Sequence, residues 1–115
     1  MSPRLFAGID IGAQSVKAVL FDGRRMLGSV VRVSDEQADA AARAVYSELL
    51  LELGLTTASV ASVFTTGWGA REVGFADRRS SEQVCASLAA RWLIPTARTV
   101  LDIGAEGCRA MTLDV

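Results

Sequence analysis

The chain has 115 residues, half of them hydrophobic, and a formal net charge of −1 at pH 7. This length suits one domain of modest core, and the near-zero charge argues against binding to nucleic acid or to an anionic membrane surface. Two cysteines without a histidine cannot complete the usual four-ligand zinc site.

The N-terminal segment predicts neither export nor membrane insertion. Residues 1–12 contain no long apolar core and no cleavage site, so we expect no signal peptide. No segment approaches the ~18 uninterrupted apolar residues that a membrane-spanning helix needs. We therefore expect a cytoplasmic protein.

The first third of the chain predicts a three-stranded antiparallel meander. Residues 4–12 form a short apolar run that ends in glycine, and residues 15–22 are rich in β-branched and aromatic side chains. The Asp-Gly pair at 22–23 is typical of a hairpin turn, after which residues 26–34 predict the third strand.

A helix is predicted over residues 35–54. Ser34 is the expected N-cap and Gln37 its capping-box partner. Alanine, valine and leucine residues recur at helical spacing up to Gly54, which has the place of a C-terminal capping glycine.

The middle of the chain predicts a strand, a loop and a second helix. The strand covers residues 59–67, and residues 68–79 form the loop, with at most one short strand near its GFAD sequence. The second helix covers residues 80–94, is capped by Ser80 or Ser81, and stops before a proline.

The end of the chain predicts two more strands, over residues 98–104 and 108–115. The IPTAR sequence at 94–98 is the expected lobe boundary. Residues 1–97 would then form one α/β lobe, and residues 98–115 would begin a second lobe.

The last predicted hairpin repeats the first one without a gap. The sequence IDIGAQSVKAVLFD at 9–22 aligns with LDIGAEGCRAMTLD at 101–114. Both copies place an aspartate at the end of an apolar strand, then a glycine turn, then a basic residue on the next strand. One copy alone would be common turn chemistry, whereas two collinear copies favour a phosphate-binding function. The sequence contains neither a P-loop nor a G-x-G-x-x-G motif after a strand.

Each copy carries groups suited to a phosphate and its cation. A glycine turn brings successive backbone N–H groups together into an anion-binding concavity. An aspartate beside it would hold a hydrated Mg²⁺ rather than the phosphate, because like charges repel. Asp10 and Asp102 are therefore the metal-binding and catalytic candidates. The candidate phosphate-binding residues are Gly12, Ala13, Gln14, Ser15, Lys17, Gly104, Ala105 and Glu106.

These hairpins resemble the phosphate-binding hairpins of the superfamily that contains acetate kinase, sugar kinases, heat-shock chaperones and actin. Within it, the chain resembles the ATPase component of benzoyl-CoA reductase and the activators of 2-hydroxyacyl-CoA dehydratases. The shared motifs are TG-aromatic-G at 66–69, AD at 76–77, a helix with an internal Cys85, and P-x-A-R-T-V-x-D-I-G at 95–104. The resemblance covers essentially the whole chain.

The resemblance implies an α/β fold in which a ribonuclease-H-like, actin-like lobe with a mixed sheet is followed by the first hairpin of a second lobe. It also implies the ATP-binding part of an ATPase subunit. Paired with a sister subunit, such a protein drives low-potential electron transfer to a reductase or dehydratase component. ATP and Mg²⁺ would be its cofactors. The family's shared [4Fe–4S] cluster takes its cysteines from downstream of the second hairpin. Cys85 and Cys108 do not match them and are expected to pack inside the fold.

The resemblance also points to Glu82, because superfamily members often place a carboxylate near this position that faces the nucleophilic water or the metal. The alternative is that Glu82 only complements the dipole of the second helix. In the second hairpin, the activators carry Gly-Gly-Gln-Asp where this chain has Gly-Ala-Glu-Gly at 104–107. One type of benzoyl-CoA reductase ATPase has the IGA turn found here, and the chain resembles that type more closely.

Two other functions stay open. The superfamily holds its nucleotide between two lobes, so a single lobe loses much of the contact area of the pocket. The chain would then be a non-catalytic assembly module, and the edge of its last hairpin would invite pairing with another chain. A fragment of a sugar kinase or an acetate-type kinase is the third interpretation. The sequence leaves open whether this chain alone is an enzyme.

Overall fold

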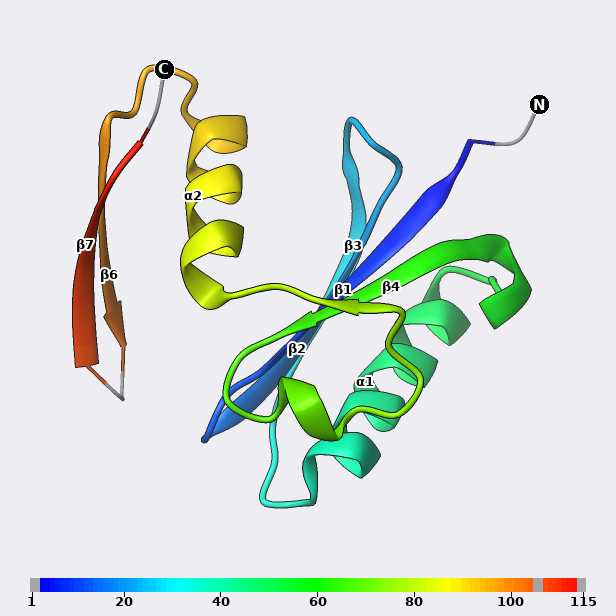
Figure 1. Cartoon of the computed structure of the whole chain (residues 1–115). Helices are drawn as coiled ribbons and strands as arrows, with labels where there is room; N and C mark the ends of the chain where they lie inside the picture. Colours follow the sequence, from blue (N-terminus) through cyan, green and yellow to red (C-terminus); the bar gives the residue numbers. More distant parts are fainter. Residues whose placement is uncertain (1–2, 105–106, 114–115) are drawn as a thin grey trace. The chain divides into compact units, whose positions relative to one another are not determined.

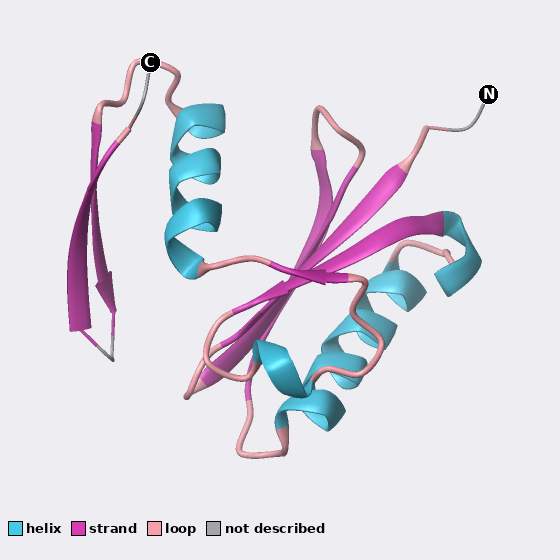
Figure 2. Cartoon of the chain, in the orientation of Figure 1, coloured by secondary structure: helices cyan, strands magenta, loops and turns pink. Residues whose placement is uncertain are grey.

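The computed structural model describes residues 3–104 and 107–113, and the chain divides into two compact units, residues 1–80 and 81–115. Figures 1 and 2 show the order of helices and strands along the chain. The first unit contains β1 (Leu5–Ile11), β2 (Ser15–Phe21), β3 (Met26–Val33), α1 (Ala38–Glu52), η1 (Thr57–Ser59), β4 (Val60–Thr66), η2 (Ala70–Glu72) and β5 (Arg78–Arg79). The second unit contains α2 (Glu82–Leu93), β6 (Thr99–Gly104) and β7 (Gly107–Thr112).

The first unit is built on a mixed five-stranded sheet with the strand order β3-β2-β1-β4-β5. The pairs β1–β2 and β2–β3 are antiparallel, as expected for the predicted meander. The pairs β1–β4 and β4–β5 are parallel. This arrangement confirms the predicted α/β fold with a mixed sheet, and it places β1 at the centre with neighbours on both edges.

Helix α1 covers one face of this sheet (Figure 2). Along β1 and β2 every second residue is buried, which is the period of a strand with one covered face. The helix contributes the buried residues Ala38, Ala41, Ala42, Val45, Tyr46, Leu49 and Leu50. Each fully buried valine or leucine in this set contributes about 1.5–3 kcal/mol, so this face is the core of the unit.

The start of α1 differs from the prediction. The helix begins at Ala38 with Gln37 at the N-cap, and no side chain caps it. Ser34 is not the N-cap, because its hydroxyl accepts a hydrogen bond from the Glu36 N–H at 3.1 Å. This local turn satisfies the serine hydroxyl before the helix begins. The predicted Ser34–Gln37 capping box is therefore wrong.

The end of α1 confirms the predicted role of Gly54. This glycine has a positive φ of 68°, and its N–H donates to the Leu51 carbonyl at 3.1 Å. The next N–H, of Leu55, donates to the Leu50 carbonyl at 2.9 Å. This pair of bonds is a Schellman motif, which satisfies carbonyls that the helix leaves unpaired.

The segment between β4 and α2 is more ordered than predicted. It contains the short helix η2, which was not predicted, and the two-residue strand β5, which directly follows the GFAD sequence near which a short strand was expected. Asp77 ties the segment to β4, because its carboxylate accepts from the Val63 N–H at 2.7 Å and its own N–H donates to the Val63 carbonyl at 2.8 Å. Asp77 therefore has a structural role here.

The same segment is also held on α1. Asp39 accepts one hydrogen bond from the Gly74 N–H and one from Arg43, each at 2.7 Å. The Arg43 guanidinium lies 5.0 Å from the centre of the Phe75 ring, which stacks on Tyr46 at 5.4 Å. These contacts join the first turns of α1 to the chain that follows β4.

The second unit pairs one helix with one hairpin. Ser81, and not Ser80, caps α2, because its hydroxyl accepts from the Val84 N–H at 3.1 Å. Strands β6 and β7 are antiparallel, and the Ser87 hydroxyl of α2 lies 3.6 Å from the Met111 sulfur of β7. Helix α2 belongs to the same compact unit as this hairpin. The lobe boundary predicted from the sequence lies after residue 97, beyond α2. The division into two lobes stays a prediction.

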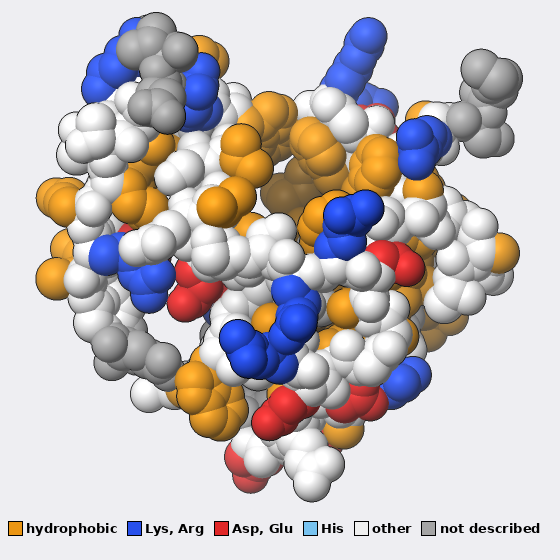
Figure 3. All heavy atoms as spheres, in the orientation of Figure 1, with side chains coloured by type: hydrophobic (Ala, Val, Ile, Leu, Met, Phe, Trp, Pro, Cys, Tyr) orange, Lys and Arg blue, Asp and Glu red, His pale blue; other side chains and the backbone are white. Residues whose placement is uncertain are grey.

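Much of the hairpin's apolar surface is open to solvent. Leu101 and Ile103 of β6 are 70% and 78% exposed, and Figure 3 shows hydrophobic side chains at the surface over this hairpin. Cys85 is half-buried and Cys108 is exposed, and both are free thiols. The expectation that both cysteines pack inside the fold is therefore wrong for Cys108, because one helix covers at most one face of a two-stranded sheet. No helix among the described residues is long and apolar enough to cross a bilayer.

Leu49 and Leu51 provide a matched test of the core, because they lie on the same helix and are 0% and 81% exposed. We expect Leu49→Ala to lower the free energy of unfolding by about 2–5 kcal/mol, since it leaves a cavity between α1 and the sheet. Leu51→Ala should change it by less than about 0.5 kcal/mol. Urea denaturation followed by circular dichroism measures both values, and equal effects would contradict this assignment of the core.

Asp39 should make stability depend on pH. The Gly74 N–H, and then Arg43, hold the pKa of Asp39 below its ordinary value of 3.8. The stabilisation is therefore fully present above pH 3.8 and is lost as the pH falls through the lower pKa of the folded state. We expect the stability difference between wild type and Asp39→Asn to shrink below this pH. Denaturant titrations at several pH values test it, with Asp35→Asn as the control for charge, and parallel pH profiles would refute it.

Candidate functional site

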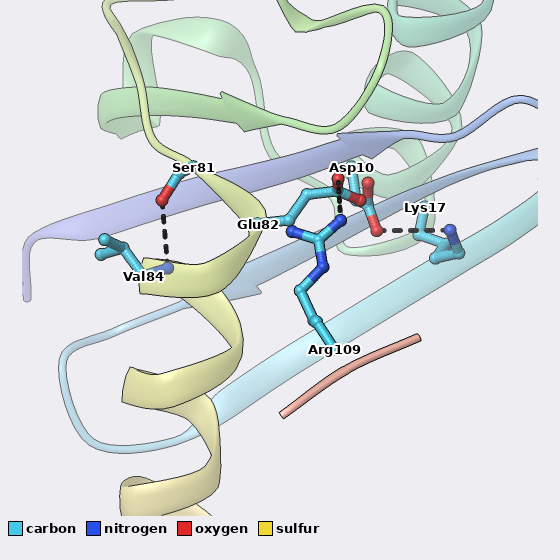
Figure 4. Close-up of polar contacts among 6 residues, drawn as sticks. All are labelled: Asp10, Lys17, Ser81, Glu82, Val84 and Arg109. Atoms are coloured by element: carbon cyan, nitrogen blue, oxygen red, sulfur yellow. Dashed lines mark hydrogen bonds and ion pairs between the residues drawn. The ribbon is translucent and has the colours of Figure 1, made fainter. Parts of the chain in front are cut away.

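The first predicted site residue, Asp10, lies one residue before the end of β1. The register of the hairpin pairs it with Lys17 of β2, and the Lys17 ammonium donates to Asp10 Oδ2 at 3.3 Å (Figure 4). Their side chains are 38% and 41% exposed. Exposed pairs of this kind contribute at most about 1 kcal/mol, so an incoming anion can compete for the lysine at little cost.

The turn between β1 and β2 carries the next candidates. The Gly12 N–H donates to the Ser15 carbonyl at 2.9 Å, so this amide closes the turn and is not directed at a ligand. Ala13 and Gln14 form the exposed tip of the turn, and Ser15 is half-buried. A Cβ built on Gly12 would lie 3.1 Å from the Ser15 carbonyl oxygen and 3.6 Å from the Lys17 nitrogen. The structure thus brings the first group of predicted residues together.

The glycines that follow β4 pack directly against the end of β1. Gly67 has a φ of 94°, and a Cβ there would lie 2.5 Å from both Asp10 Oδ1 and the Ile11 carbonyl oxygen. A Cβ on Gly69 would lie 2.6 Å from the Ile11 side chain and 2.7 Å from the Ala38 Cβ. No real Cβ approaches other atoms this closely, so both positions require glycine.

Trp68 is the aromatic residue between these two glycines, and it is 74% exposed. In the sequence this segment is recognisable only as a motif, and no local pattern places it beside Asp10. The signal that the sequence offers is a pair of glycines around an aromatic residue, directly after a buried strand. Such a pattern indicates a tight backbone approach, but not which strand is approached.

The Asp10 carboxylate is only half satisfied. Oδ2 faces Lys17, whereas Oδ1 is buried and has no hydrogen-bond partner. Burying a carboxylate oxygen without a partner is costly, so this oxygen is suited to bind a ligand at this end of β1. Mg²⁺ is typically held by one or two carboxylates, several waters and substrate phosphates. A single aspartate beside a lysine fits that type of binding.

The second hairpin repeats the register of the first one. Asp102 is paired with Arg109 and Ile103 with Cys108, at the aligned positions of Asp10 with Lys17 and Ile11 with Val16. Strand β6 ends at Gly104 and β7 begins at Gly107, and these two glycines are partners in this register. The predicted site residues at positions 105 and 106, Ala105 and Glu106, lie outside the described residues.

The basic residue of the second hairpin has a different partner. Arg109 lies 3.5 Å from the Glu82 carboxylate (Figure 4), and the two side chains are 42% and 47% exposed. Glu82 is in the first turn of α2, so it both complements the helix dipole and pairs with the hairpin. This contact brings Glu82 to the β6–β7 hairpin inside the second unit.

No iron–sulfur site is found among the residues that the structure describes. The sequence contains two cysteines. They lie on different elements, Cys85 on α2 and Cys108 on β7. No group of three or more His, Cys, Asp or Glu side chains suited to a metal occurs among the described residues.

Comparison with known proteins identifies relatives over nearly the whole chain. The activator of lactoyl-CoA dehydratase from Anaerotignum propionicum is 32% identical over 93% of this chain and 41% of its own length. A component of benzoyl-CoA reductase from Thauera aromatica is 36% identical over 94% of this chain and 40% of its own. The chain thus spans about two fifths of the length of these curated relatives.

A solved structure of the same kind supports the fold. The activator of the 2-hydroxyisocaproyl-CoA dehydratase from Clostridium difficile, with bound ADPNP, superposes with a TM-score of 0.87. It is 28% identical and aligns over 96% of this chain and 41% of that one. Residues 7–115 match the model of one ATPase family. The chain therefore belongs to the BadF/BadG/BcrA/BcrD ATPase family.

Proposed function

We propose that this chain is the ATP-binding part of an ATPase subunit that drives low-potential electron transfer to a benzoyl-CoA reductase or a 2-hydroxyacyl-CoA dehydratase. The observation that carries the proposal is the half-satisfied carboxylate of Asp10. It stands at the end of the central strand, with Lys17 on one oxygen and no partner on the other. The names of the relatives supply the two classes of partner enzyme.

The first hairpin supplies the groups that a Mg²⁺–nucleotide needs. Asp10 would hold the hydrated cation, and Lys17 would turn from the carboxylate to a phosphate oxygen. This exchange replaces one charge-assisted hydrogen bond by another, so it costs little. The turn residues Gly12, Ala13, Gln14 and Ser15 would line the phosphate.

The second hairpin carries counterparts of these groups in the sequence. Asp102 is the counterpart of Asp10, and Gly104, Ala105 and Glu106 are the counterparts of residues in the first turn. We assign Glu82 to the nucleophilic water or the metal, with Arg109 holding its carboxylate in place through the 3.5 Å contact. We also propose a sister subunit and an iron–sulfur cluster shared with it. The cysteines that would hold this cluster are not among the residues of this chain.

Asp10→Asn should weaken binding of Mg²⁺–ADPNP about tenfold or more, because it removes the charge that attracts the cation while keeping the shape of the side chain. Asp35→Asn carries the same change in charge at an exposed position and should bind like wild type. Isothermal titration calorimetry of the chain measures both affinities. The same substitution in an ATPase assay with the partner enzyme tests the coupling to electron transfer. Undiminished binding and hydrolysis by Asp10→Asn would refute the proposal.

Gly67→Ala tests the close approach of the β4 turn to Asp10. Gly23 is the matched control, because its φ of 96° is close to the 94° of Gly67 and nothing lies within 4 Å of a Cβ built there. Both substitutions should cost about 1–2 kcal/mol of stability from the left-handed backbone, and Gly67→Ala should cost more, because its Cβ also meets the Ile11 carbonyl. Only Gly67→Ala should also weaken nucleotide binding, since its methyl group displaces the Asp10 carboxylate. Thermal denaturation and calorimetry separate these effects, and similar binding by the two variants would contradict the role of Gly67.

A further inference from the structure

Thr66, the last residue of β4, is the direct neighbour of Asp10 across the sheet. The parallel register of β1 and β4 pairs Asp10 with Thr66. Paired residues of adjacent strands point to the same face of a sheet, so both side chains lie on the face opposite the buried core. The preceding residue, Thr65, points into the core, where it is 1% exposed and its hydroxyl donates to the Ala70 carbonyl at 3.4 Å.

The Thr66 hydroxyl shares the unusual state of its neighbour. Its Oγ1 atom is buried and has no hydrogen-bond partner, like Asp10 Oδ1. Among the described residues the same state is found for Glu48 Oε2, but that oxygen lies 2.6 Å from the Arg32 guanidinium. Native proteins pair nearly all buried polar atoms. Two unpaired oxygens at one register position therefore indicate a ligand that binds both.

The chemistry of the two groups narrows that ligand. A carboxylate only accepts hydrogen bonds, whereas a threonine hydroxyl both donates and accepts. A phosphate would meet repulsion from Asp10, and an apolar group would leave both oxygens unpaired. A hydrated cation satisfies both, because each water of its shell donates to an oxygen of the protein. Mg²⁺ keeps several such waters when it binds with a nucleotide.

We propose that Thr66 is a further binding residue for the hydrated Mg²⁺ of the nucleotide, and that its hydroxyl takes one water of the cation's shell beside the Asp10 carboxylate. This inference rests on the proposed function. Thr66 acts on the cation and not on the nucleotide itself. Its effect should therefore be confined to conditions in which the metal is present.

Three variants test this role. Thr66→Val keeps the shape of the side chain and removes the hydroxyl, Thr66→Ser keeps the hydroxyl, and Thr65→Val removes the neighbouring hydroxyl that faces the core. Affinity for ADPNP is measured by calorimetry with Mg²⁺ and with EDTA, and the melting temperature is measured without ligand. Wild type and Asp10→Asn are titrated in parallel.

We expect Thr66→Val to weaken Mg²⁺–ADPNP binding about tenfold, to leave metal-free binding unchanged, and to be at least as heat-stable as wild type. The last result follows because the substitution removes a buried hydroxyl that has no partner. Thr66→Ser should bind like wild type. Thr65→Val should lower the melting temperature and keep its affinity.

Three results would overturn the inference. Wild-type affinity in Thr66→Val would exclude Thr66 while the proposed function stands. A lowered melting temperature in Thr66→Val, with weaker binding in EDTA as well, would show a structural role. If wild type itself does not bind Mg²⁺–ADPNP, the proposed function fails, and the role of Thr66 fails with it.

Discussion

The pairing of β1 with a strand on each edge is the constraint on which the site depends. The antiparallel pair with β2 places Lys17 opposite Asp10, and the parallel pair with β4 places Thr66 on the other side. A strand held on both edges and packed on α1 cannot shift its register without turning its apolar side chains to the opposite face. The packing of the core residues of β1 therefore fixes the position of the Asp10 carboxylate.

The turn after β4 makes use of this rigidity. Gly67 approaches Asp10 so closely that no side chain fits, and Gly69 does the same against Ile11. The Gly69 N–H also donates to the Ile11 carbonyl at 3.1 Å. The approach buries one oxygen of the carboxylate and leaves it without a partner. A site that stays partly unsatisfied without its ligand loses some stability, and it binds a ligand that restores the missing contacts more tightly.

The two hairpins share a register but differ in their ion pairs. In the first hairpin the lysine binds the aspartate across the strands, whereas in the second the arginine binds Glu82 of α2. The longer, planar guanidinium reaches a carboxylate on a neighbouring helix, and the compact ammonium stays on its own hairpin. The repeat is therefore a repeat of backbone geometry, and the two copies offer different side-chain chemistry.

Local sequence patterns were sufficient for several features that depend on neighbouring residues. The alternation in β1 and β2, the positive φ of Gly54 and the equal registers of both hairpins follow from contacts within a few positions, and the cap of α2 is one of the two serines that the sequence offered. The prediction was wrong for Ser34, whose hydroxyl forms a turn instead of a cap, and for Cys108, which is exposed. It did not find Gly67 or Thr66 as neighbours of Asp10. Those two positions are more than fifty residues away from Asp10 along the chain. Only the parallel pairing of β4 with β1 brings them to the carboxylate. The choice of strand partner depends on how the whole sheet buries its apolar side chains, and no local sequence pattern determines it.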